Sequence, residues 1–132
     1  MYHHSLEKWE NKLKHALDWL DDYLEDRYGN RFSLHPARRE RGTTVNKSHD
    51  GLFDIVSSFS AGKGSKFGRG YIVDVHMATL NNIPEAVQNE INDIVIKELR
   101  KTLPELFPGK NLEVHMDGNI IKIHGDLSLG KI

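Results

Sequence analysis

The segment from Ser60 to Tyr71 brings glycines, cations and aromatic rings together between two strand-like runs. Its glycines are Gly62, Gly64, Gly68 and Gly70, its cations are Lys63, Lys66 and Arg69, and its aromatic residues are Phe67 and Tyr71. Glycine lets backbone N–H groups approach a ligand closely, and neighbouring cations favour an anion. The rings could stack on bases while the cations hold phosphates. The segment therefore predicts a non-catalytic site for a phosphate-bearing partner, RNA or a nucleotide rather than duplex DNA, without a cofactor.

The spacing of this segment differs from the known phosphate-binding loops. A P-loop has a second glycine five residues after the first and is followed by a helix, whereas Phe67 stands five residues after Gly62 and a strand pattern follows. The dinucleotide fingerprint fails at the same position. Residues 69–71 match the start of the RNA-recognition fingerprint, but Ile72 and Asp74 break it. A general anion site remains, and the alternative is a hairpin tip whose charges only maintain solubility.

Further cations could extend the positive surface. Arg38, Arg39 and Lys47 precede the segment, and arginine forks suit phosphate groups. The competing interpretation is local neutralisation, which Arg41 could share. Residues 18–26 contain five carboxylates and no Lys or Arg, and they fall near the negative end of a predicted helix, where they need positive neighbours.

A second hypothesis concerns His/Asp pairs. Asp74 and His76 are two residues apart in a predicted strand, so they share a face and could bind a metal or exchange a proton. Apolar neighbours on that face predict partial burial. His49 and Asp50 could contribute to the same site. Catalytic zinc needs three protein ligands and no HExxH motif occurs, so the alternative is a hydrogen-bonded pair in a half-buried strand. A metal-assisted or acid–base enzyme around Asp74 and His76 stays open.

A third hypothesis is self-association without catalysis. Trp19 and Tyr23 lie at the margin of the apolar stripe of the first predicted helix. Aromatic residues in that position often belong to homodimer interfaces, although a ring that shields its own core is at least as common. The pattern leaves open a homo-oligomer formed through this helix.

Composition limits these hypotheses. With 132 residues and 38% hydrophobic content, one domain over residues 1–132 is expected. The absence of cysteine excludes disulfides and thiolate metal sites. No apolar run approaches the roughly 20 residues that a membrane helix requires, so we expect a soluble, cytoplasmic protein without membrane contact. The net charge of −1 conceals an acidic helix and a basic middle.

Hydrophobic periodicity predicts the elements that must position these residues. A period of 3.6 predicts helices over residues 5–28 and from Pro84 to Pro104, and β-rich runs predict strands over 52–60 and 71–80. Residues 31–50 are expected to form a long loop, with a short strand at 43–47. Together with a final hairpin, the order is α-β-β-α-β-β. This predicts an α+β two-layer sandwich with two helices on one face of a mixed, four- to six-stranded sheet.

The final hairpin is expected to turn at Asp117-Gly118, a type I′ sequence. That turn pairs Val114 with Ile121 and places His115 and His124 on the outer, wet face. In this register the two histidines are about two ladder positions apart, which is too far to share an ion.

Overall fold

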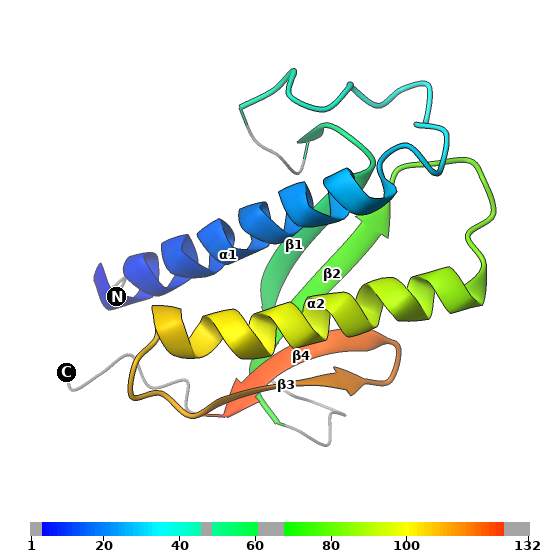
Figure 1. Cartoon of the computed structure of the whole chain (residues 1–132). Coiled ribbons are helices and arrows are strands. Elements are labelled where there is room, and N and C mark those ends of the chain that lie inside the picture. Colours follow the sequence, from blue (N-terminus) through cyan, green and yellow to red (C-terminus); the bar gives the residue numbers. More distant parts are fainter. Residues whose placement is uncertain (1–3, 46–48, 61–67, 126–132) are drawn as a thin grey trace.

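Two helices lie across one face of a four-stranded sheet in the computed structural model (Figure 1), which describes residues 4–45, 49–60 and 68–125. The elements are α1 (His4–Tyr28), β1 (Phe53–Ser60), β2 (Gly70–Met77), α2 (Glu85–Leu106), β3 (Leu112–Asp117) and β4 (Ile120–Gly125). The strands are ordered β1-β2-β4-β3. The α+β class and the element order are therefore confirmed.

The sheet differs from the expectation in one respect: its ladders are antiparallel, not mixed. A parallel contact within the described residues is the isolated bridge between Arg39 and Asp50. The short strand expected at residues 43–47 is not seen in its described part, since residues 43–45 form bends. The rest of that segment, including Lys47, lies outside the described residues.

The apolar stripe of α1 forms much of the core, as its spacing predicts. The stripe comprises Trp9, Leu13, Leu17, Leu20, Leu24 and Tyr28, which are all buried. Trp9 stacks on Tyr71 of β2 and on Phe107 just after α2, with ring centroids 4.7 and 4.6 Å apart. This stack of three rings ties the start of α1 to the sheet and to the end of α2, so both helices are held on the same face.

The final hairpin forms with a register two residues away from the expected one. Val114 pairs with Ile123, and Asp117 pairs with Ile120, so the turn is Gly118-Asn119. Gly118 has φ of +68°, and glycine at the first central position is typical of a type II′ turn. The expected register was wrong because two adjacent turn sequences were available. A shift by two keeps every side chain on its predicted face.

Two side chains form hydrogen bonds with the backbone at the start of β1, where a neighbouring strand would otherwise do so. The Glu25 carboxylate accepts the N–H groups of Leu52 and Phe53, with Oε1 at 2.6 and 3.1 Å. Arg38 donates to the carbonyl oxygens of Asp50, Gly51 and Phe53 at 2.9 to 3.0 Å. These bonds satisfy buried backbone groups at the point where the chain enters the sheet.

Candidate functional site

The predicted glycine-rich site is only partly within the described residues. Gly62, Lys63, Gly64, Lys66 and Phe67 lie outside them, as does Lys47. The described part begins at Gly68, which has φ of +76°, and continues through the exposed Arg69 into β2. The geometry of the candidate site is therefore that of Gly68–Gly70 and its neighbours in the sheet.

This base of the glycine-rich segment is attached to β4 through Lys122. The ammonium group of Lys122 donates to the carbonyl oxygen of Gly68 and lies 3.7 Å from the Asp117 carboxylate. Lys122 is only 1% exposed although it lies on the outer face of the sheet. A buried ammonium needs such partners, because an unpaired charge would be costly to bury. The contact fixes where the segment leaves the sheet.

Gly70 is required for packing against β4. A Cβ atom at Gly70 would overlap the carbonyl oxygen of Ile123, and it would also lie against the aliphatic part of Lys122. Gly70 has no positive φ, so the need for glycine here is steric. Packing against β4 is therefore an alternative to the sequence-based interpretation, in which this glycine lets a ligand approach.

Replacing Gly70 with alanine should destabilise the fold by about 1–3 kcal/mol, the usual cost of overpacking. The matched control is Gly68→Ala, where a Cβ meets nothing within 4 Å and only the positive φ is penalised, at about 1–2 kcal/mol at most. Urea unfolding of both variants measures the difference. A Gly70→Ala variant as stable as wild type would show that β2 and β4 can separate to admit a methyl group.

His115 and His124 form a direct pair beside Lys122. The Nδ1 atom of His115 lies 2.8 Å from Nε2 of His124, and the rings stack with centroids 5.0 Å apart. This contradicts the expectation that they lie too far apart. Burial, followed by the nearby His115, lowers the pKa of His124. One ring must donate and the other accept, so the hydrogen bond requires that at least one of the two rings is a neutral imidazole.

Tyr71 is not available as a stacking platform in this structure. Its ring is 7% exposed and is stacked on Trp9, with the edge of Phe59 on another side. Tyr71 instead anchors β2 to the core. Of the two predicted stacking residues, only Phe67 remains, and it lies outside the described residues.

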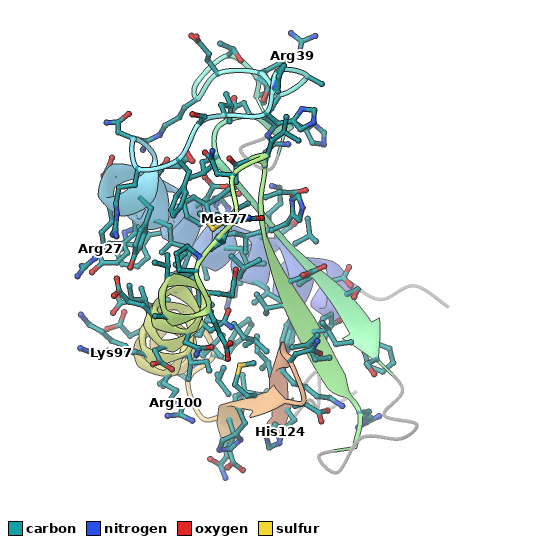
Figure 2. The ribbon with its side chains drawn as sticks, turned by 90° about the vertical axis from the view of Figure 1, so that its right-hand side faces the viewer. Arg27, Arg39, Met77, Lys97, Arg100 and His124 are labelled. Atoms are coloured by element: carbon teal, nitrogen blue, oxygen red, sulfur yellow. The ribbon has the colours of Figure 1, made fainter. Side chains whose placement is uncertain are left out.

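Arg38 and Arg39 lie at the other end of the hairpin from Gly68 and Arg69. Arg38 contacts the start of β1, as described above, and β1 spans about 23 Å between its ends at the usual rise per residue. Figure 2 places the labelled Arg39 at the opposite end of the molecule from His124. The structure therefore does not bring these arginines to the candidate site.

Arg41 provides the positive neighbour that the acidic half of α1 was expected to need. Its guanidinium donates to Asp26 at 2.9 Å and to Asp22 at 3.2 Å. Both carboxylates raise the pKa of Arg41, with the hydrogen bond to Asp26 the larger cause. Such exposed pairs add only about 0–1 kcal/mol each, but they neutralise the helix end locally.

The predicted Asp74/His76 pair is on the outer face, where both side chains are exposed, so the expected partial burial was wrong. Asp74 borders a hollow of about 450 Å³ between β2, α2 and the hairpin, whose α2 side carries the amides of Gln88, Asn89 and Asn92. Amides do not supply acid–base chemistry. Among the described residues, no group of three or more metal-ligating side chains occurs.

His49 and Asp50 do not join Asp74 and His76. Asp50 is buried and accepts hydrogen bonds from the N–H and hydroxyl of Thr44 at 2.8 and 2.9 Å. Burial alone would raise the pKa of Asp50, but the bonds from Thr44, with those from the backbone of Gly42 and Thr43, outweigh it and the pKa is lowered. Asp50 is thus an ionised acceptor that shapes the 39–50 loop, while His49 is exposed.

Trp19 and Tyr23 stack on each other on the surface of α1, with centroids 5.3 Å apart. Arg27 adds a hydrogen bond of 3.0 Å to the Tyr23 hydroxyl and lies over its ring. Trp19 is 49% exposed. The three side chains thus contact one another in a row along the helix. Self-association through this surface stays a hypothesis.

These features define a class of protein: a small α+β protein with two helices on one face of an antiparallel sheet and a polar cluster on the other. A family model described as "Uncharacterised protein" matches residues 4–125, and the chain belongs to that family. The chain is also similar to an uncharacterized protein of Borreliella burgdorferi, at 40% identity over 118 residues, which cover 89% of this chain and 92% of that protein. No solved structure matches the chain significantly.

Neither helix in the described part of the chain combines the length and apolar character needed to cross a membrane.

Proposed function

We propose that the protein binds a phosphate-bearing ligand, with RNA as the first candidate, on the helix-free face of its sheet beside the glycine-rich segment. Both helices pack on the opposite face (Figure 2), so the outer face of β2 and β4 is not covered by α1 or α2. On this face Asp74 and His76 of β2 are exposed, whereas Lys122 and His124 of β4 are buried. Arg69 is exposed at the edge of this face, and Lys63 and Lys66 precede it in sequence.

The observation that carries the proposal is the contact between Lys122 and the carbonyl oxygen of Gly68. Because it attaches the base of the segment to β4, it holds the backbone beside Arg69 next to the sheet. The Lys122 ammonium is itself occupied by Gly68 and Asp117, so we assign it the role of a positioning residue. Phosphate contacts are assigned to Arg69 and to the cations that precede it.

Binding to single-stranded RNA should weaken as salt rises, because each phosphate neutralised by a cation releases counterions. A fluorescein-labelled single-stranded RNA oligonucleotide can be titrated by anisotropy at several salt concentrations. Arg69→Gln should lower the affinity and reduce the slope of log K against log salt by about 0.7, the value for one contact on a single strand.

Lys97→Gln is the matched control, since it also removes one exposed cation. Lys97 belongs to α2 and lies on the helix-covered side in Figure 2, so its loss should leave the slope unchanged. Absence of binding, an affinity independent of salt, or equal effects of the two substitutions would contradict the proposal.

A further inference from the structure

The two edge strands of the sheet, β3 and β1, differ in how well they are protected against pairing with a further strand. The short edge strand β3 carries the exposed Glu113, and its Val114 carbonyl accepts two bonds from Arg100 at 3.0 and 2.7 Å. Charges and covering groups on an edge prevent it from pairing with another strand. The other edge, β1, is longer and has no charged residue between Ile55 and Phe59.

The hydrogen-bond pattern identifies the backbone groups of β1 that point outward. The N–H of Ala78 donates to the carbonyl of Leu52, so this carbonyl and the backbone groups of Asp54, Val56 and Ser58 face β2. Phe53 and every second residue after it face away, because bonded and non-bonded pairs alternate in an antiparallel ladder. The outward groups of Phe53 are already bonded to Glu25 and Arg38. Those of Ile55, Ser57 and Phe59 have no partner in the described part of the chain.

A groove of about 370 Å³ runs beside these groups. Its floor is β1 from Ile55 to Phe59, and its wall is formed by Glu10, Lys14, Leu17 and Asp18 of α1. Phe59 is 57% exposed and Val56 is 46% exposed. A long edge strand with exposed apolar side chains and unpaired backbone groups is a template for an added strand.

We propose that the added strand is β1 of a second copy, paired antiparallel about a two-fold axis at Ser57 to give a continuous eight-stranded sheet. In this register Ser57 pairs with itself and Ile55 pairs with Phe59 of the other copy. The outward-pointing positions therefore map onto one another, as an isologous interface requires. The apolar Phe59 is placed opposite an apolar residue on the helix side.

The charges also favour a second copy in this register. Asp54, the charged residue of β1, falls opposite Ser60 of the other copy and not opposite Asp54. The α1 wall of the groove carries both signs, with Lys14 Nζ 3.4 Å from Asp18 Oδ1, so the two-fold axis does not gather like charges. At the axis, Ser57 is small enough for the two strands to approach.

Sedimentation equilibrium over a range of concentrations should reveal a dimer of the wild-type chain. Ser57→Pro should abolish it, because proline removes an N–H that points away from β2 and is tolerated on an edge strand. A melting temperature close to that of wild type would establish that the monomer still folds. Ser58→Ala is the control, since its side chain lies on the helix-free face and its backbone pairs with β2.

A charge exchange tests the register itself. Ser57→Lys and Ser57→Asp each place like charges directly opposite one another, and each alone should dimerise on the order of a hundredfold more weakly. Mixed together, the two variants should form a heterodimer. A monomeric wild type up to about 1 mM, a dimer that survives Ser57→Pro, or no heterodimer in the mixture would overturn the proposal.

Discussion

Replacing Asp21 with asparagine is expected to stabilise the protein strongly near pH 8 and hardly at all near pH 4. Asp21 is buried in the second half of α1. Burial, and then the neighbouring carboxylate of Glu25, raise the pKa of Asp21 to about 8. Asparagine has nearly the same shape and is neutral at every pH, so the substitution keeps the packing and removes the ionisable group.

The direction of the pH dependence follows from proton binding. The ordinary pKa of the Asp21 carboxyl is 3.8, so between that value and about 8 the folded chain keeps a proton that the unfolded chain has released. This stabilisation is fully present below pH 3.8 and is lost as the pH rises through about 8. The free energy of unfolding should fall by up to about 1.4 kcal/mol per pH unit across this window.

Urea unfolding of both proteins across this pH window measures the effect. Wild type should lose stability toward the upper end, while Asp21→Asn should lose much less. The exposed Asp93 on α2 gives a matched control, and Asp93→Asn should follow the wild-type curve. Parallel curves for wild type and Asp21→Asn would mean that Asp21 is ionised in the folded protein.

Replacing Glu25 with alanine is expected to destabilise the fold by about 2–6 kcal/mol. The N–H groups of Leu52 and Phe53 would both lose their acceptor while they remain buried, and each unsatisfied group costs about 1–3 kcal/mol. The same change should loosen the start of β1, which Glu25 and Arg38 hold together.

Glu25→Gln separates this role from the charge. Both N–H groups bond to Oε1, so the amide oxygen of glutamine can accept both, and only the longer bond of 3.2 Å from Leu52 to Oε2 is lost. The measurement belongs near pH 6, because Asp21 is then protonated in wild type and repulsion between the two carboxylates does not enter. Alanine should cost several times more than glutamine, and equal losses would contradict the acceptor role.

The helices and the β1–β2 hairpin were predictable from the sequence because their patterns are long. The stripe from Trp9 to Tyr28 has a period of 3.6 over the whole of α1, and only one helix face can satisfy it. The register of the β3–β4 hairpin was not predictable in the same way. Asp117-Gly118 and Gly118-Asn119 are both good turns, and side-chain alternation does not distinguish a shift of two residues.

That shift decides which side chains meet on the outer face of the sheet. It brings His115 next to His124 and places Lys122 opposite His115. The buried roles of Glu25, Asp21 and Lys122 were missed for a related reason. Their partners are backbone atoms or residues far away in sequence, and a charged residue on a helix or strand is usually at the surface.

The sequence by itself determined the class of fold, the order of its elements and, in the helices and strands that the structure describes, the face on which the side chains lie, because these depend on local periodicity. The tertiary structure decided which charges remain available. Arg38 donates hydrogen bonds to backbone carbonyl groups, and Arg41 forms an ion pair with Asp26 of α1. Arg69, in contrast, is exposed beside the sheet. Contacts between residues far apart in the sequence determine which charged groups are buried or hydrogen-bonded. A local sequence pattern does not reveal these contacts.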